Sequence, residues 1–279
     1  MYAFGLEEAG HYRHAEDVGR RAVELARDDC WAIHAIAHVL EMEGRREEGI
    51  DWLTTRIDDW APDNFFAVHN WWHLALYHLD VGNESEVMPL YDKAVRPGPN
   101  ASILDAIDAS ALLWRLHLVG LSVGERWDEL ANLWASWAQE GYYAFNDAHA
   151  MMAYVAAGRR DAARNLLETL ERCVNDGDSN AAMTREVGLP VCRALLAFGD
   201  ARYDETVDEL LRIRRYIHHF GGSHAQRDVF ARTLVEAADR SGRDALSTAL
   251  LSERMERRQV SPVHLPSLLS RARTKVSEV

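Results

Sequence analysis

Histidine and carboxylate side chains recur at helical spacing in the first third of the chain. His34, His38 and Glu41 stand at positions i, i+4 and i+7, so on one helix they share a stripe. His69 and His73 repeat the i, i+4 spacing further along. Imidazole and carboxylate groups are ligands for zinc and iron, and they are also the usual groups of acid–base catalysis. The spacing therefore predicts a polar site that would suit either chemistry.

The histidine pairs alone do not specify a metal site. Two histidines four residues apart occur by chance in helices, and the sequence holds no HExxH motif in which a glutamate would act as the base. It also lacks the GxSxG, GxxxxGK[ST] and CxxC patterns. If a metal does bind, the ligands that we expect for zinc or iron are His38, His73 and Asp108.

More polar side chains follow in a similar register, on each later helix. Asn70 and Trp72 lie beside the second histidine pair. In a helical-repeat superhelix the first helix of each pair lines the concave surface, so residues at matching positions should converge on one groove. The further groove residues predicted on this basis are Asp105, Asp108, Asn146, Asp147, His149, Arg185, Gln226, Arg227 and Asp228.

Helix pairs separated by glycine would position these residues. Each glycine ends an apolar run and precedes a second amphipathic run, at intervals of about 34 to 43 residues. Glycine adopts the left-handed conformation that ends a helix at the least steric cost. Because one helix pair cannot bury its apolar face alone, the pairs should stack on one another. The marker glycines are Gly10, Gly44, Gly82, Gly120, Gly158, Gly199 and Gly242.

We therefore predict an all-α fold, an α-solenoid of about seven tetratricopeptide-like antiparallel helix pairs, with a plain helical bundle as the alternative. One repeat array is expected over residues 1–260 and a capping segment over 261–279. The first helices are predicted at 2–9, 30–43, 65–81, 101–119, 144–157, 184–198 and 224–241. Their partners are predicted at 12–27, 46–57, 85–95, 125–139, 160–173, 203–218 and 243–257.

Charge and composition limit the partners. The net charge of −13 repels a phosphate backbone, so we expect no nucleic acid. No run of about 18 apolar residues would span a membrane. The chain shows no basic segment followed by an apolar run at its start, and its cysteines form no CxxC pair, which together favour the cytoplasm. The first helix pair has no preceding repeat, which predicts self-association through apolar residues such as Leu6, Val18, Val23 and Leu25.

Three interpretations of the groove residues follow. In the first, which the sequence favours, the groove binds a peptide, a protein partner or a small polar ligand. In the second, the same residues form the site of a metal-dependent or acid–base enzyme. In the third, they hydrogen-bond one another as a purely structural ladder between packed helices. The sequence leaves open whether the chain is an enzyme.

Several blocks of the sequence resemble a known family. They are residues 34–42 (HAIAHVLEM), 69–77 (HNWWHLALY), 145–149 (FNDAH), 185–190 (REVGLP) and 221–230 (GGSHAQRDVF). In this order, and over almost the whole chain, they resemble the tetratricopeptide repeat protein 38 family of bacteria and animals. The resemblance implies a helical-repeat fold and an unassigned molecular function. Nearly all the predicted groove residues match the motifs of that family, whereas Glu186 and His224 depart from them.

Members of that family normally carry an additional N-terminal helical region. The resemblance therefore implies that this chain, which begins inside the pattern at residues 2–6 (YAFGL), corresponds to the C-terminal part, as a short member or a fragment. If the additional region covers one mouth of the groove, a partner would be needed to complete the site.

Overall fold

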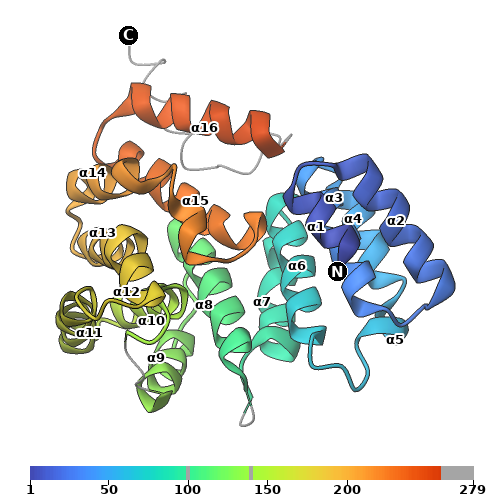
Figure 1. The fold of residues 1–279 in the computed structure, drawn as a ribbon, viewed down its shortest axis with the longest axis horizontal. Coiled ribbons are helices and arrows are strands. Elements are labelled where there is room, and N and C mark those ends of the chain that lie inside the picture. The colour runs from blue at the N-terminus through green and yellow to red at the C-terminus, as the bar shows by residue number, and fades with distance from the viewer. Residues whose placement is uncertain (99–100, 138–140, 259–279) are drawn as a thin grey trace. The chain divides into compact units, whose positions relative to one another are not determined.

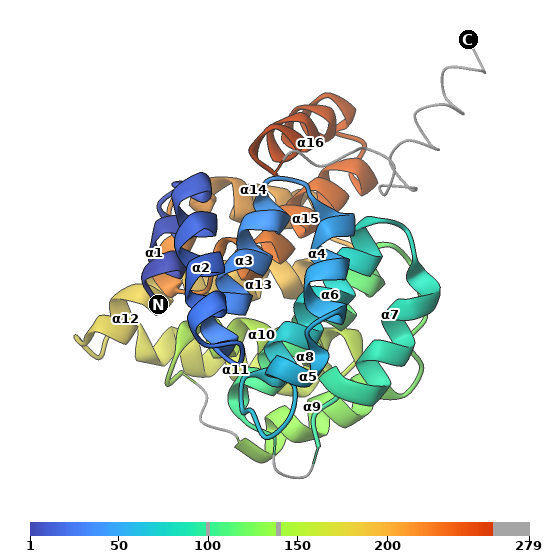
Figure 2. The same ribbon diagram turned by 90° about the vertical axis from the view of Figure 1, so that its right-hand side faces the viewer.

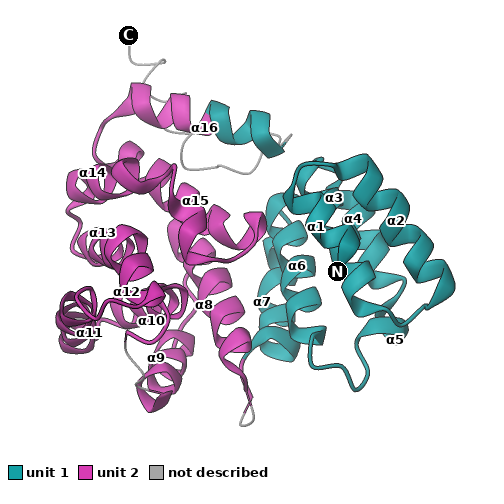
Figure 3. Cartoon of the chain, in the orientation of Figure 1, with its two compact units in different colours: residues 1–96, 252–279 teal, residues 97–251 magenta. Residues whose placement is uncertain are grey.

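The computed structural model describes residues 1–98, 101–137 and 141–258, and the regular secondary structure in these ranges is entirely helical (Figure 1 and Figure 2). The predicted all-α class is thereby confirmed. The chain forms two compact units, which Figure 3 shows in separate colours: unit 1 comprises residues 1–96 and 252–279, and unit 2 comprises residues 97–251. The predicted capping segment at 261–279 lies outside the described residues. Among the described helices, none has the length and apolar character needed to cross a membrane.

Unit 1 contains the N-terminal helices and the end of the last one. Its helices are α1 (Tyr2–Glu8), α2 (Tyr12–Leu25), α3 (Cys30–Met42), α4 (Arg46–Thr54), α5 (Ile57–Trp60), α6 (Ala67–Asp80) and α7 (Glu84–Leu90), the last continuing as a π-helical turn (Tyr91–Val95). Helix α16 (Asp244–Arg258) belongs to unit 1 from residue 252 onward. Along the chain, α1 packs on α2 and α3, α3 on α4, α4 on α6, and α6 on α7, while α6 also contacts α3.

Unit 2 holds the remaining helices. They are α8 (Ile103–Leu118), α9 (Arg126–Trp137), α10 (Ala144–Ala156), α11 (Arg160–Cys173), α12 (Ser179–Met183), α13 (Leu189–Gly199), α14 (Tyr203–Ile213) and α15 (His224–Arg240), together with the first part of α16. A π-helical turn (Thr184–Gly188) joins α12 to α13, and a 3-10 turn (Ile217–Phe220) precedes α15.

Each predicted helical range corresponds to helical structure, with ends that differ by a few residues. Two short elements were not predicted: α5, and helix α12 ahead of the range that begins at 184. The predicted helix at 203–218 ends earlier, at Ile213, and the chain then turns into the 3-10 segment. Local apolar periodicity therefore predicts the long helices well, whereas it does not detect α5 and α12, which have only four and five residues.

The marker glycines end helices as predicted, with one exception. Six of them have φ angles between 69° and 80°, the left-handed region that favours glycine. At Gly44 the following amide, of Arg45, donates to the Leu40 carbonyl at 2.8 Å, which closes the end of α3. The prediction is wrong for Gly199, which is the last residue of α13, and Ala201 takes the left-handed conformation instead. A Cβ at Gly199 would lie 2.2 Å from the Val155 Cγ1, so glycine is required there for close packing.

A tyrosine and a glycine fix the position of α6 against its neighbours. The Tyr77 hydroxyl on α6 donates to the Ala37 carbonyl on α3. On the facing side, a Cβ at Gly49 of α4 would lie 2.2 Å from the Tyr77 ring, so only glycine allows α4 to approach so closely. The tyrosine is 1% exposed, in a core that also holds Trp52 and Trp60. These contacts set the register between α3 and α6, the two helices that carry the histidine pairs.

Helices α8 and α15 of unit 2 pack directly on each other, which the sequence did not predict. The indole of Trp114 donates to the Thr233 hydroxyl at 2.9 Å, and the guanidinium of Arg115 donates to the Ala225 carbonyl at 2.7 Å. Both donors are almost completely buried. Side chains therefore fill the space between α8 and α15, so these two helices leave no open groove between them.

Candidate metal centre

Four histidines from two helices meet in the interior of unit 1. His34 and His38 come from α3, whose first turn is capped by the Asp29 carboxylate, which accepts a hydrogen bond from the Ala32 amide at 3.0 Å. His69 and His73 come from α6. One nitrogen of each imidazole lies within 4.8 Å of a nitrogen of every other. The i, i+4 spacing on both helices thus produces a single cluster, because the two stripes face each other.

The cluster is fully enclosed. The four side chains are between 0% and 4% exposed, and the imidazole pairs pack with ring centroids 4.4 to 5.0 Å apart. The Nε2 atoms of His34 and His38 are 2.9 Å apart, so one donates a hydrogen bond to the other when no ion separates them. Burial and the neighbouring imidazoles of His38, His69 and His73 hold the pKa of His34 well below its usual range. His34 is therefore neutral near pH 7, the form in which imidazole binds metals.

Carboxylates stand behind two of the imidazoles. The Nδ1 atom of His73 lies 3.1 Å from Glu41 Oε2, and the Nδ1 atom of His38 lies 3.5 Å from Glu7 Oε2. A carboxylate at Nδ1 favours the tautomer with the proton on that nitrogen, which leaves the Nε2 lone pair available. Metal-binding histidines in proteins have such partners almost always, and these partners fix both tautomer and ring orientation.

The Glu41 carboxylate is held in turn by an arginine that is distant in sequence. Arg258, at the end of α16 and within unit 1, forms an ion pair with Glu41. Burial lowers the pKa of Arg258 to about 10, while the charges of Glu7 and Tyr12 oppose that shift. Arg258 therefore stays charged at neutral pH, and its ion pair holds Glu41 beside His73.

Aromatic rings form the walls of the cluster. Phe4 stacks on His34 with ring centroids 5.3 Å apart, and Phe66 contacts the same imidazole edge-on at 4.8 Å. Trp72 stacks on His69 at 5.1 Å with only 13° between the planes. On the same helix as Trp72, Asn70 is completely buried and neither atom of its amide has a hydrogen-bond partner among the described residues. An apolar wall of this kind excludes water and strengthens any charge interaction inside it.

Sequence reasoning found the four histidines, Glu41, Asn70 and Trp72, and all of these lie in unit 1. It missed Glu7 and Arg258. Glu7 lies on a seven-residue helix with no repeat of the histidine pattern, and Arg258 is distant in sequence from the cluster. No local signal marks either residue, because only the tertiary fold brings them to the imidazoles.

The other predicted groove residues belong to unit 2, and two of them are helix caps. The Asp105 carboxylate accepts a hydrogen bond from the Ser102 amide at 2.7 Å, and Gln226 accepts one from the Ser223 amide at 3.0 Å. Both complete capping boxes, of α8 and of α15. A signal for this role was present in the sequence, since serine precedes each residue by three positions.

Three further predicted residues of unit 2 are buried with contacts of their own. Asp147 accepts a hydrogen bond from the Gly141 amide at 3.1 Å. His149 donates through Nδ1 to the Phe145 carbonyl at 2.8 Å, and its burial, aided by the charge of Arg115, lowers its pKa to about 4 despite that bond. Asp108 is completely buried on α8. The metal set proposed from sequence therefore combines two residues of unit 1 with one of unit 2.

The remaining four residues lie nearer the surface of unit 2. Arg185 is exposed and donates to the Val174 carbonyl at 2.8 Å. Arg227 is half-buried and donates to the Gly222 carbonyl. Asn146 is half-buried on α10, and Asp228 is 7% exposed on α15. The two arginines thus bind backbone oxygens close to them.

Comparison of the sequence with models of known protein families gives no match. The resemblance to the tetratricopeptide repeat protein 38 family therefore stays a prediction.

Proposed function

We propose that unit 1 binds a divalent transition-metal ion, zinc or iron, through His34, His38, His69 and His73. The observation that carries this proposal is that four buried imidazoles, two of them with carboxylates at Nδ1, bring one nitrogen each within 4.8 Å of the others. At a Zn–N distance of about 2.0–2.1 Å, two ligands of a tetrahedral site lie about 3.3 Å apart. Small rotations of the imidazoles would therefore close the cluster onto one ion.

Burial favours a metal ion over an organic ligand at this site. A peptide or small polar ligand needs accessible surface, whereas the four histidines are at most 4% exposed. A metal ion needs no accessible surface once it is bound, and it is small enough to lie among the four imidazoles. The groove for a peptide, a protein or a small polar ligand, which the sequence favours for these histidines and the later polar residues together, stays a prediction.

A structural hydrogen-bonded cluster is the second candidate. The observation that favours it is the 2.9 Å contact between the Nε2 atoms of His34 and His38, which is a hydrogen bond in the absence of an ion. In that case the histidines only stabilise the packing of α3 on α6. Loss of a buried partner would then cost about 1–3 kcal/mol with or without metal.

Elemental analysis by inductively coupled plasma mass spectrometry separates these candidates. We expect about one metal ion per chain in tag-free protein, and almost none in the His38→Ala/His73→Ala variant. The matched control is His11→Ala/His14→Ala, which removes two exposed histidines of the same unit and should keep the metal. If the parent takes up no zinc, iron or manganese even after incubation with their salts, the metal proposal is wrong.

A second measurement covers the case in which the double variant does not fold. Metal that binds only the native parent raises its stability by about 2.7 kcal/mol at a free concentration one hundred times the dissociation constant. The midpoint of thermal unfolding should therefore rise with added zinc and fall again with a chelator. An unchanged midpoint in both conditions would favour the structural cluster.

We further propose that the helix pairs form a tetratricopeptide-like solenoid of the tetratricopeptide repeat protein 38 type. The order of long helices and the glycine-ended turns support this architecture. The cytoplasmic location and self-association through the N-terminal helices also stay predictions. Of the apolar residues named for that contact, Leu25 is exposed and Val23 is buried, so Leu25→Ser is the variant to compare by light scattering.

A further inference from the structure

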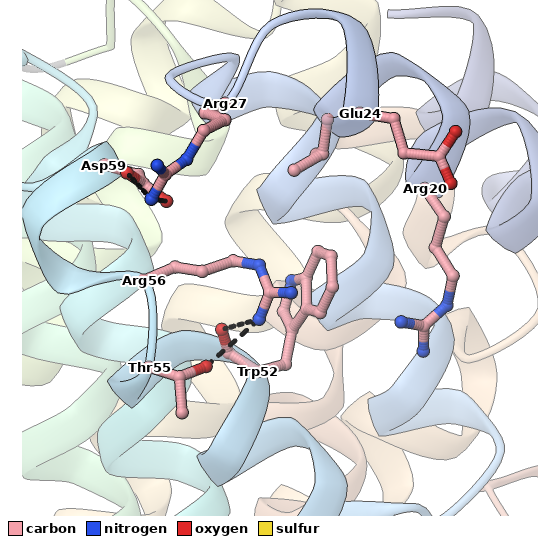
Figure 4. Close-up of a pocket in the computed structure, with 8 residues that line it drawn as sticks. Arg20, Glu24, Arg27, Trp52, Thr55, Arg56 and Asp59 are labelled. Atoms are coloured by element: carbon pink, nitrogen blue, oxygen red, sulfur yellow. Dashed lines mark hydrogen bonds and ion pairs between the residues drawn. The ribbon is translucent and has the colours of Figure 1, made fainter.

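A pocket of about 430 Å³ opens on the surface of unit 1, among residues that take no part in the histidine cluster. Helix α2 contributes Arg20 and the turn after it contributes Arg27, while the end of α4 with the turn beyond it contributes Trp52 and Arg56 (Figure 4). In Figure 4, Arg56 lies across the Trp52 ring in the middle of the pocket, with Arg27 and Arg20 on either side. Three guanidinium groups therefore surround one aromatic floor.

The floor of the pocket is rigid. Trp52 is 5% exposed, and its indole donates to the Ile33 carbonyl at 3.0 Å. The guanidinium carbon of Arg56 lies 3.8 Å from the centroid of the indole, and that of Arg20 lies 4.9 Å from it. Stacking on a fixed ring orders these two guanidinium groups.

The acidic residues that line the pocket are already neutralised. Asp59 accepts two hydrogen bonds from Arg27, at 3.0 and 3.2 Å. Glu24 accepts one from Arg21 at 2.8 Å. These carboxylates therefore do not compensate the charge at the centre of the pocket.

Arg56 is the guanidinium that lacks such compensation. Arg20 donates to Glu16 and to Glu48, at 2.7 Å each. Arg56 instead donates to two neutral acceptors, the Trp52 carbonyl at 3.3 Å and the Thr55 hydroxyl at 3.0 Å. No carboxylate of the described residues lies in ion-pair contact with it. Its burial and the charge of Arg20 lower its pKa, Asp59 opposes that change, and Arg27 adds to it.

We propose that this pocket binds the phosphate group of a small phosphate monoester. Arg56 would donate to the phosphate from the aromatic floor, and Arg20 and Arg27 would lie on either side of it. Arginine suits this role because its planar fork matches two phosphate oxygens at once. The volume is large enough for a small phosphorylated molecule.

Isothermal titration calorimetry with inorganic phosphate tests this proposal on the full chain at constant ionic strength. The variants are Arg56→Gln, and Arg13→Gln as the matched control, since Arg13 is an exposed arginine of α2 in the same unit and lies outside the pocket. We expect Arg56→Gln to weaken phosphate binding at least tenfold and Arg13→Gln to leave it unchanged. Glycerol 3-phosphate should bind at least as tightly as inorganic phosphate.

Three results would overturn the proposal: no phosphate binding by the parent, equal binding by both variants, or binding only to phosphatidylcholine vesicles that contain phosphatidic acid. The last would assign the pocket to a membrane surface. If Arg56→Gln does not fold, Arg27→Gln replaces it, because the Arg27 side chain is 80% exposed and its loss should leave the core intact. That variant should weaken phosphate binding severalfold, and an unchanged affinity would count against the pocket.

Discussion

The two units of the chain both carry polar residues on their long helices, but they use them differently. In unit 1, α3 and α6 each present two histidines at i, i+4 to each other, so that four imidazoles share one enclosed space. In unit 2 the comparable residues cap helices, bind backbone oxygens or lie buried on separate helices.

The difference shows what turns a polar stripe into a site. Unit 2 has a single histidine at the comparable position, and its Nδ1 atom binds the backbone of its own helix. Its first helices α8 and α15 are joined by Trp114 and Arg115, whose polar atoms are satisfied by a hydroxyl and by carbonyls. A site forms where the polar side chains of neighbouring helices contact one another instead of forming hydrogen bonds with the backbone.

Acid stability should give the largest effect that we expect from unit 2. Burial lowers the pKa of His149 to about 4, whereas the unfolded chain has a histidine pKa of about 6.5. Between these values the unfolded state binds a proton that the folded state does not. Stability is therefore lost as the pH falls through this window, by about 1.4 kcal/mol per pH unit.

Replacement of that histidine should flatten the pH dependence. The free energy of unfolding is measured with urea between pH 4 and 7 in the presence of a chelator. Between pH 7 and pH 4 it should fall less in His149→Gln than in the parent, and the difference between the two falls should reach about 3 kcal/mol at pH 4. The exposed His219→Gln is the control and should follow the parent. Identical slopes in parent and His149→Gln would contradict the assigned burial of this imidazole.

The carboxylate behind His73 gives the next effect in size, and it should be confined to unit 1. Glu41→Gln keeps the shape of the side chain but removes the charge that orients the imidazole and pairs with Arg258. We expect metal affinity to fall about 10- to 100-fold, measured by competition with a coloured chelator. Glu43→Gln, two residues further along at the end of α3, should change the metal affinity little. Equal losses of affinity in both variants would contradict the orienting role of Glu41.

The smallest effect distinguishes a helix cap from a groove residue. Asp105→Ala removes half of the capping box of α8, and we expect it to lower the free energy of unfolding by about 1 kcal/mol. Metal content should be unchanged. Asp17→Ala, an exposed acidic residue of α2, is the control and should alter stability by less than about 0.5 kcal/mol. An unchanged stability in Asp105→Ala would argue that the carboxylate serves something other than the helix.

Much of the helical framework follows from the sequence because its signals are local. Apolar periodicity predicts the long helices, and glycines such as Gly44 mark their ends. The same local rule fails at Gly199, where glycine is required because Val155 packs closely against it. The sequence also shows the capping boxes that begin at Ser102 and Ser223, but the prediction places their partner residues, Asp105 and Gln226, in the groove.

The candidate site could be predicted only in part. Spacing along α3 and α6 identifies the imidazoles, because i, i+4 neighbours share a helix face whatever the tertiary fold. Glu7 and Arg258 depend on packing between segments that are far apart in the chain. The enclosure of the cluster by Phe4 and Phe66 likewise depends on packing, and it is this enclosure that favours an ion over a larger ligand.

X-ray absorption spectroscopy of the metal-loaded chain tests the central claim most directly. With zinc bound, we expect four nitrogen scatterers at about 2.0–2.1 Å, with the outer-shell pattern of imidazole, in the parent and in His11→Ala/His14→Ala. A first shell dominated by oxygen or sulfur, or a spectrum unchanged in His38→Ala/His73→Ala, would contradict a four-histidine metal centre in unit 1.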